Sequence, residues 1–472
     1  MRVVIIGGGP GGYEAALVGA QLGGEVTLIE DRGLGGSAVL TDVVPSKSLI
    51  AVSGVMSRAR KSNEMGLVYE AADSRGKPLV KVDLMKVNAS VKALAKAQSD
   101  DIRHRLERDG ITLIEGRGRL NGPHEVIAET ATGEVRLPAD YILVSVGTRP
   151  RTLPDAQPDG ERILTWAQLY DIDEIPERLI VVGSGVTGTE FANAYDALGV
   201  PITLVSSQPQ VLPGQDPDAT KVLQALFHER GMDLVLGSRA VRAHREGNGV
   251  VVTLEDGREV LGSHVLMAVG SIPNTHDIGL TEAGVILKPS GHINVDRVSR
   301  SSAQGVYAAG DCTGVFPLAS VAAMQGRIAM WHALGDAVEP FNRAEVSSNI
   351  FTNPEIATVG VTQDDIDSGR VRGIGVTLPL ASNPRAKMLG FKDGFVKLFC
   401  RPSTGNIIGG VIVAPRASEL IHSIAIAVAE QINVDDFAHD FTVYPSLSGS
   451  IAEAARRLHG HSIELLNQQI TL

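Results

Sequence analysis

The chain has 472 residues, of which 43% are hydrophobic and 52 are glycine. This length fits about three domains, and the glycine content suits an α/β protein with many tight turns between strands and helices. A net charge of −11 favours solubility and argues against binding to nucleic acid. The two cysteines, Cys312 and Cys400, lie far apart, which excludes a disulfide framework. No Cys/His cluster has the spacing of a metal site, so we expect no bound metal.

The hydropathy pattern contains no window close to the roughly 18 to 20 uninterrupted apolar residues of a membrane span. The sequence opens directly on an apolar strand, without a basic segment or a cleavage site of the kind that marks a secretory signal. We therefore expect a soluble, cytoplasmic protein with no membrane span.

The first predicted elements form a strand–turn–helix–strand unit at the N-terminus. A β-branched run at residues 3–6 is typical of a buried parallel strand. It leads into a GxGxxG turn at residues 7–12, a predicted helix at residues 13–21, and a second strand at residues 26–29 that ends at Glu30. In this context the glycine pattern indicates a dinucleotide-binding fold.

Each of the three glycines that define this turn has a physical task in binding a dinucleotide. Gly7 permits the tight turn, Gly9 lets a pyrophosphate approach the backbone, and Gly12 lets the helix pack closely on the strand. The helix N-terminus offers free N–H groups to the phosphates. Glu30 is placed to accept hydrogen bonds from the hydroxyls of a ribose.

The same unit recurs in the middle of the chain. A strand at residues 178–182 leads into a second GxGxxG turn at residues 183–188, a predicted helix at residues 189–198, and a strand at residues 202–205. Two such folds predict two nucleotides whose reactive rings meet, because hydride transfer requires near contact.

The second turn uses Gly183, Gly185 and Gly188 in the same three tasks. Its second strand, however, ends at Ser206 rather than at an acidic residue. A carboxylate there favours NAD and repels the 2′-phosphate of NADP, whereas an arginine grips that phosphate. Ser206 does neither, so we expect the protein to use both NADH and NADPH.

Several further stretches resemble the flavoprotein disulfide reductases, the family of dihydrolipoamide dehydrogenase, and together they cover nearly the whole chain. The matching stretches are residues 142–150 (family pattern IIATGSRP), 266–275 (GRxPNT), 305–311 (the second FAD motif) and 349–360 (xxFTxPEIAxVG). The resemblance implies an α/β fold with two Rossmann-like dinucleotide-binding domains and a C-terminal α+β dimerisation domain. It also implies FAD as cofactor, NAD(P)H as co-substrate, and a homodimer formed through the C-terminal domain.

The same resemblance divides the chain into four segments. Residues 1–150 are the first segment of an FAD-binding domain, and residues 151–275 are an inserted NAD(P)-binding domain. Residues 276–345 are the second FAD-binding, or central, segment, and residues 346–472 are the dimerisation domain.

Five further cofactor-binding residues follow from the resemblance. Asp311 is expected to bind the ribitol chain of FAD, and Gly118 to contact the adenine through its backbone. Ser145 and Gly147 belong to the strand and turn that close the first FAD segment, and Gly270 lies in the corresponding turn after the second fold.

Two charged residues match a pair that lies beside the flavin in this family. Lys47 follows a retained Pro-Ser, and Glu190 lies on the helix of the second nucleotide fold. Both partners are present, which matters because a buried charge without its partner costs several kcal/mol. The resemblance therefore implies a catalytic Lys47–Glu190 pair.

The segment at residues 35–47 departs from the family where its chemistry lies. The family pattern is GGTCxNxGCxPSK, but here Ala38 and Val43 occupy the positions of the two cysteines. Neither side chain forms a thiolate or a disulfide, and the thiolate is the species that performs disulfide exchange.

The C-terminal domain departs from the family in the same way. Relatives carry HPTxSE, whose His is an acid/base oriented by the Glu, whereas this chain has Tyr444 and Gly449 at those positions. A tyrosine, with a usual pKa near 10, donates a hydrogen bond but is a poor general base at neutral pH. Tyr444 either assists a reduced acceptor or packs at the subunit interface, and soluble transhydrogenases of this family carry a Tyr-Pro there as well.

These observations predict an FAD-dependent NAD(P)H:quinone oxidoreductase that passes hydride from NAD(P)H to FAD and directly on to a quinone, without lipoamide dehydrogenase activity. Planar quinones suit an apolar slot beside the flavin and need no thiol partner. Two alternatives stay open: a soluble pyridine nucleotide transhydrogenase, and a non-catalytic flavoprotein partner of a dehydrogenase complex.

Overall fold

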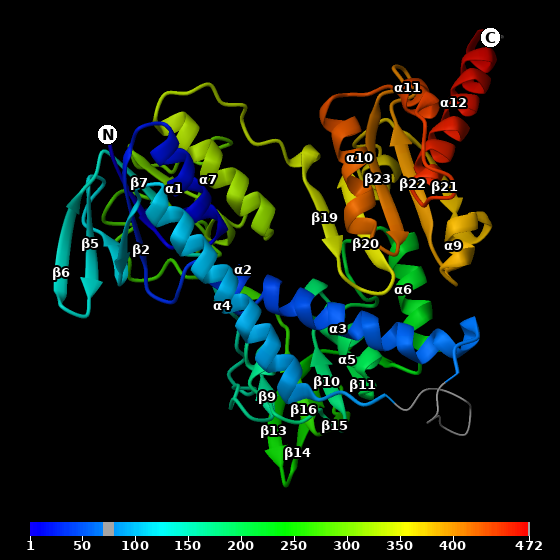
Figure 1. The fold of residues 1–472 in the computed structure, drawn as a ribbon, viewed down its shortest axis with the longest axis horizontal. Coiled ribbons are helices and arrows are strands. Elements are labelled where there is room, and N and C mark those ends of the chain that lie inside the picture. The colour runs from blue at the N-terminus through cyan, green and yellow to red at the C-terminus, as the bar shows by residue number, and fades with distance from the viewer. Residues whose placement is uncertain (69–79, 471–472) are drawn as a thin grey trace. The chain divides into compact units, whose positions relative to one another are not determined.

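The structure is a computed structural model that describes residues 1–68 and 80–470, with side chains described as far as residue 459. The chain forms two compact units (Figure 1). Unit 1 comprises Met1–Val182 and Val241–Phe341, and unit 2 comprises Gly183–Ala240 and Asn342–Leu472.

Unit 1 is built around a parallel sheet in the order β18-β7-β1-β2-β3. Its strands are Val306–Ala308 (β18), Tyr141–Val144 (β7), Arg2–Ile6 (β1), Glu25–Glu30 (β2) and Thr112–Glu115 (β3). The side chains of β1 alternate between two apolar cores. Val3 and Ile5 face a core formed with helices α1 (Pro10–Gln21), α4 (Leu84–Arg108) and α7 (Ala319–Ala333). Val4 and Ile6 face a second core on the other side of the sheet.

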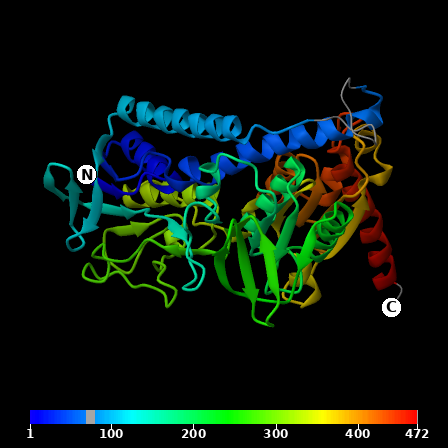
Figure 2. The same cartoon turned by 90° about the horizontal axis from the view of Figure 1, so that it is seen from below.

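That second face is covered in part by an antiparallel three-stranded sheet, visible beside the parallel sheet in Figure 1. Its strands are Arg117–Leu120 (β4), Glu125–Thr130 (β5) and Gly133–Pro138 (β6). On the first face, α4 also packs against α3 (Val43–Lys61), and Figure 2 shows the two as long neighbouring helices.

The rest of unit 1 consists of short strands. Leu179–Val182 (β10) pairs in parallel with His264–Met267 (β16), which pairs with Ile163–Leu164 (β9). Thr148–Pro150 (β8) pairs with Ser271–Pro273 (β17). The remaining elements are Ala240–Glu246 (β13), Gly249–Leu254 (β14), Glu259–Gly262 (β15), Gly36–Leu40 (α2) and the 3₁₀ turns Ser62–Met65 (η1), Gln168–Tyr170 (η2) and Asp311–Thr313 (η3).

Unit 2 contains part of the second nucleotide fold and the whole of a second sheet. The nucleotide part comprises Val186–Leu198 (α5), Ile202–Val205 (β11), Pro217–Glu229 (α6) and Asp233–Val235 (β12). The sheet is antiparallel, in the order β19-β20-β23-β22-β21: Ser347–Ile350, Glu355–Gly360, Ile407–Ala414, Phe395–Cys400 and Ile374–Pro379.

Helices and 3₁₀ turns complete this second unit. They are Arg343–Glu345 (η4), Gln363–Asp367 (α8), Leu380–Ser382 (η5), Pro384–Met388 (α9), Ala417–Ala429 (α10), Val434–His439 (α11) and Gly449–Ile470 (α12). Every residue of β22 and β23 is buried, and α10, α11 and α12 contribute to the core beside them. Burial on both faces explains why these strands read as nearly continuous apolar runs in the sequence.

The predicted fold class is confirmed, with small shifts at element ends. The helix expected from residue 13 begins at Pro10, because a proline is well tolerated in the first turn, where its missing N–H has no helical partner. The four predicted segment boundaries stay a prediction.

Among the described residues, Gly36–Met65 is the one stretch that is long and apolar enough to cross a membrane by length and composition. The structure divides it between α2, α3 and η1. Core helices of water-soluble proteins pass the same test, so the stretch is weak evidence for a span.

Candidate active site

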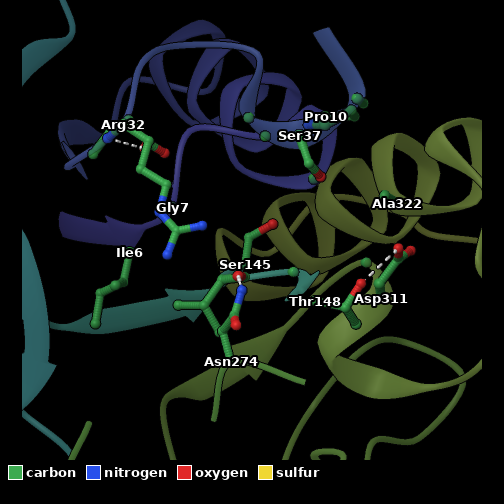
Figure 3. Close-up of a pocket in the computed structure, with 18 of the residues that line it drawn as sticks. Ile6, Gly7, Pro10, Arg32, Ser37, Ser145, Thr148, Asn274, Asp311 and Ala322 are labelled. Atoms are coloured by element: carbon green, nitrogen blue, oxygen red, sulfur yellow. Dashed lines mark hydrogen bonds between the residues drawn. The ribbon is translucent and has the colours of Figure 1, made fainter. Parts of the chain in front are cut away.

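Unit 1 contains a cavity of about 810 Å³ at the carboxyl ends of β1, β2 and β7 (Figure 3). Ligands of open α/β sheets bind at this edge. A volume of this size is within the range of cofactor pockets.

The first glycine turn shapes the floor of this cavity. Gly7 has φ +100°, and a Cβ there would overlap the carbonyl of Ser145. A Cβ on Gly12 would overlap the carbonyl of Gly7, so the close crossing of helix and strand requires glycine. Gly9 caps α1 in extended conformation, and a Cβ there would meet no atom within 4 Å. The space in front of Gly9 is therefore open, and its use by a pyrophosphate stays a prediction.

Glu30 lies at the cavity wall with its carboxylate held by backbone groups. Its Oε2 accepts a hydrogen bond from Gly8 N at 2.6 Å, and its Oε1 accepts one from Arg32 N at 2.7 Å. A third hydrogen bond, from Gly33 N to Oε1 at 3.3 Å, also holds the carboxylate. An ionised carboxylate has about four acceptor sites, so about one is left for a ribose hydroxyl.

Gly118 lies on β4 against Ile6 of β1. A Cβ on Gly118 would lie 2.8 Å from Ile6 Cγ2, so a larger residue would push β4 away from the sheet. Gly116, Arg117 and Gly118 all line the cavity, and the contact of Gly118 with an adenine stays a prediction.

Ser145, Gly147 and Asp311 line the opposite part of the wall, and their contact with the cofactor stays a prediction. Ser145 is nearly buried, and its hydroxyl makes no hydrogen bond to any described residue. Asp311 follows β18 and accepts a 3.5 Å hydrogen bond from Thr148 Oγ1, drawn in Figure 3. Burial raises the pKa of the Asp311 carboxyl, because the charged form loses hydration. A hydrogen bond donated by a hydroxyl of a bound ligand would stabilise that charged form.

Two further polar residues at the cavity escaped the sequence reasoning. Figure 3 shows the Arg32 side chain extending toward Gly7 and Ser145. Asn274 also lines the cavity, donates from Nδ2 to the Val146 carbonyl at 3.0 Å, and donates from its backbone N to Gly147 O at 3.1 Å. Arg32 lies in a loop that shows no hydrophobic periodicity, so the sequence offers no signal for it. Asn274 belongs to the stretch at residues 266–275 that matches the family pattern GRxPNT, and that match could have suggested its place at the cavity.

The segment that carries no cysteine pair forms one end of the cavity. Ala38 of α2 and Val43, the first residue of α3, both line it. A Cβ on Gly36 would lie 2.9 Å from Gly9 Cα, so this segment packs directly on the first glycine turn. Lys47 lies one turn further along α3 and is partly buried.

The two cysteines of the chain are elsewhere and are poor nucleophiles. Cys312 is fully buried, and its thiol points at the carbonyls of Ala309 and Val144, at 3.3 and 3.6 Å. Burial raises the pKa of the Cys312 thiol to about 12 and that of Cys400 to about 11. Neither forms appreciable thiolate at neutral pH.

The second glycine turn begins in unit 2 with Gly183, which has φ +112° and donates to Val205 O at 2.9 Å. Gly185 caps α5 in extended conformation with open space where a Cβ would be, and Gly188 is buried in the first turn of α5. This arrangement repeats that of the first turn. Gly270 lies in unit 1, where its carbonyl accepts a hydrogen bond from Arg151 N.

Ser206 is bound to the glycine turn rather than directed outward. Its hydroxyl lies 2.7 Å from that of Ser184, and both side chains are buried. Ser206 Oγ also accepts a hydrogen bond from Gln208 N at 3.0 Å. The position that carries an acid in NAD-selective folds is thus a neutral hydroxyl pair.

Glu190 lies on α5 and is 3% exposed. Its Oε1 accepts a 2.8 Å hydrogen bond from the backbone N of Phe351, which belongs to the C-terminal part of unit 2. Lys47 belongs to unit 1, so its pairing with Glu190 stays a prediction.

Tyr444 lies in a segment with large exposed apolar side chains. It is 83% exposed, and Phe441 and Val443 are exposed as well. Its chemical role stays a prediction.

A glycine-lined cavity at the sheet edge, a carboxylate at the end of β2 and a second glycine turn are typical of an oxidoreductase that uses a flavin and a pyridine nucleotide. The open space at Gly9, the Glu30 carboxylate and the unpartnered Ser145 hydroxyl fit FAD.

The chain belongs to the pyridine nucleotide-disulphide oxidoreductase family. The family model matches residues 1–326, and the model of the family's dimerisation domain matches residues 346–455. The protein is therefore an oxidoreductase that uses FAD and NAD(P)H.

Individual relatives agree with this assignment. The chain is 53% identical over 470 residues to an NAD(P)H dehydrogenase (quinone) of Mycobacterium tuberculosis, covering 98% of this chain and 94% of that protein. It is 31% identical to a dihydrolipoyl dehydrogenase of Haloferax volcanii, covering 99% and 98%.

The fold agrees with solved structures as well. The crystal structure of LpdA from Mycobacterium tuberculosis matches with a TM-score of 0.92 at 53% identity, covering 97% of this chain and 99% of that one. The flavoprotein disulfide reductase RclA from Escherichia coli matches in fold with a TM-score of 0.85 at 21% identity, covering 97% and 99%.

Proposed function

We propose that this protein oxidises NAD(P)H and reduces a quinone, with bound FAD as the electron carrier between the two and no redox disulfide. FAD supplies a ring that accepts two electrons from a nicotinamide and releases them singly or in pairs. The reaction balances as NAD(P)H, one proton and a quinone giving NAD(P)⁺ and a quinol.

The observation that carries the proposal is the cavity wall at residues 36–43. Ala38 and Val43 line the end of the cavity where disulfide reductases carry their cysteine pair. The two cysteines of the chain are buried with raised pKa values. Small apolar groups at this wall leave room for a planar acceptor. The 53% identical relative named NAD(P)H dehydrogenase (quinone) supports the same acceptor class.

The experiment separates the two half-reactions in stopped flow. Anaerobic NADH or NADPH is expected to bleach the flavin absorbance within milliseconds to seconds, and a quinone is expected to restore it. Oxidised lipoamide is the control and is expected to leave the flavin reduced. Reoxidation by lipoamide as fast as by quinone would reject the proposal, and a flavin that ignores both nucleotides would favour the non-catalytic alternative.

Transhydrogenation is a second candidate, favoured by the neutral Ser184–Ser206 pair. The pair places no charge where NAD and NADP differ, so one site suits both nucleotides. Mixing NADPH with a thio-analogue of NAD tests it: reduction of the analogue at a rate comparable to quinone reduction would make transhydrogenation the better description.

We propose a homodimer formed through residues 346–472, supported by the match to a dimerisation domain. Light scattering after gel filtration is expected to give twice the chain mass. A cytoplasmic location stays a prediction.

A further inference from the structure

The carboxylate of Glu190 is held by a segment that lies far from it in the sequence. Phe351 N donates to Glu190 Oε1 at 2.8 Å, and both residues belong to unit 2. A hydrogen bond to an ionised carboxylate is stronger than one between neutral groups. The position of residues 351–353 therefore helps to set where the Glu190 charge lies.

Residues 351–353 are in turn held by Asn193, one helical turn after Glu190 on the same helix. Asn193 is buried, and its Oδ1 accepts from Asn353 N at 3.3 Å and from Arg230 Nη1 at 2.9 Å. Arg230 Nη2 also donates to the Asn353 carbonyl. Both lone pairs of the Asn193 side-chain carbonyl accept a hydrogen bond. Any rotation of this side chain would therefore break at least one of the two hydrogen bonds.

Arg230 is itself fixed, because helix α6 is anchored at both ends. Arg230 follows its last turn, and Asp216 caps its first turn through bonds from Asp218 N and Ala219 N. The buried Lys397 of β22 donates to both oxygens of Asp216, at 2.8 and 3.1 Å. Helix α6 thus connects the sheet of the dimerisation domain to the segment that contacts Glu190.

We propose that Asn193 and Arg230 are positioning residues of the nicotinamide site: they hold residues 351–353 against α5, so that the Phe351 N–H orients the Glu190 carboxylate. This inference rests on the proposed role of Glu190 in hydride transfer. Its consequence is that the dimerisation domain, which supplies Phe351 and Asn353, sets the geometry of the reductive half-reaction.

The variants are Asn193→Ala and Arg230→Met, with Arg230→Lys as the conservative variant and Arg370→Met as the control. Among the described residues, Arg370 forms ion pairs with the exposed Asp364 and the half-buried Asp365. Stopped-flow reduction at varied NADH gives the limiting rate constant and the Kd, and reoxidation by quinone is measured separately.

We expect the limiting rate constant of flavin reduction to fall by on the order of tenfold to a hundredfold in Asn193→Ala and Arg230→Met, because small displacements at a reacting centre have effects of this size. The Kd for NADH and the rate of reoxidation are expected to stay within about threefold of wild type, a split that general loss of structure would not give. Arg230→Lys is expected to recover part of the rate, since a lysine reaches one acceptor where the guanidinium reaches two.

Amide hydrogen exchange supplies a readout independent of turnover. Exchange at residues 351–353 is expected to be faster in Asn193→Ala and unchanged in Arg370→Met. Wild-type reduction rates in both variants, or unchanged exchange, would overturn the inference while leaving the proposed function intact. A wild-type flavin that NADH does not reduce would instead overturn the proposed function.

Discussion

Replacing Lys397 by methionine tests the buried ion pair that anchors helix α6. The Lys397 side chain is 2% exposed, and that of Asp216 is 3% exposed, with Nζ and Oδ2 2.8 Å apart. At an effective dielectric constant of about 20 this distance corresponds to an attraction of about 6 kcal/mol. Burial of the two ions costs several kcal/mol each, so the pair as a whole contributes little net free energy.

Removing one partner is a different perturbation, because it leaves the other charge buried without compensation. We expect Lys397→Met to lower the free energy of unfolding by about 3 to 5 kcal/mol. The double variant Lys397→Met/Asp216→Asn removes both charges and keeps the helix cap, since asparagine is as good an N-cap as aspartate. It is expected to recover most of this loss, and Asp218, whose side chain is 58% exposed, remains solvated.

Denaturant unfolding of the FAD-loaded protein, followed by circular dichroism and flavin fluorescence, measures these changes. Lys92→Met is the matched control, because Lys92 and Asp171 lie 2.7 Å apart on the surface, with side chains 54% and 61% exposed. Its cost is expected to be below about 1 kcal/mol. A loss below about 1 kcal/mol in Lys397→Met, or additive losses in the double variant, would refute the reasoning.

Three further predictions concern the nucleotide sites and pH. Gly12→Ala places a Cβ on the carbonyl of Gly7 and is expected to lower FAD content per chain at least about tenfold, measured by absorbance after gel filtration. Ser206→Glu introduces a carboxylate at the position that carries an acid in NAD-selective folds, and it is expected to raise the NADH to NADPH ratio of kcat/KM by at least about tenfold. An unchanged ratio of kcat/KM would show that residue 206 does not determine the choice between NADH and NADPH. Burial, followed by the charge of Arg162, lowers the pKa of His264 from 6.5 to about 4. Between these pH values the unfolded chain binds a proton that the folded chain does not, so the free energy of unfolding falls by at most about 3 kcal/mol as pH drops from 6.5 to 4. His264→Gln is expected to remove this part of the pH dependence, and an identical profile would contradict it.

Local patterns predicted much of the fold and the shape of the first nucleotide site. The turn at Gly7 needs φ +100°, and the crossing at Gly12 leaves no space for a Cβ. A glycine at each of these positions therefore predicts the local backbone geometry. Glu30 follows a short apolar strand at the expected distance and lies at the cavity wall. These relations hold within about 30 residues of chain, where spacing and sterics suffice.

Other features could not be read from spacing. Lys397 stands within the apolar strand β22, where the sequence gives no sign that its partner is Asp216, 181 residues earlier. Ser206 is predicted to leave both NADH and NADPH usable, but the sequence gives no sign that its hydroxyl is bonded to that of Ser184. The partner of Lys397 is set by how elements distant in the sequence pack, and that of Ser206 by how the turn after β10 folds against the end of β11.

The amino-acid sequence by itself determined the α/β class, the two glycine turns and the absence of a cysteine pair at residues 38 and 43, because these depend on residue type and local period. Only the tertiary structure decided that the Phe351 N–H holds Glu190 and that Asn193 and Arg230 hold that segment in place. Hydrogen bonds that span from 37 to 161 residues of chain have no local signature, since they form only when separate elements are brought together by packing of the core.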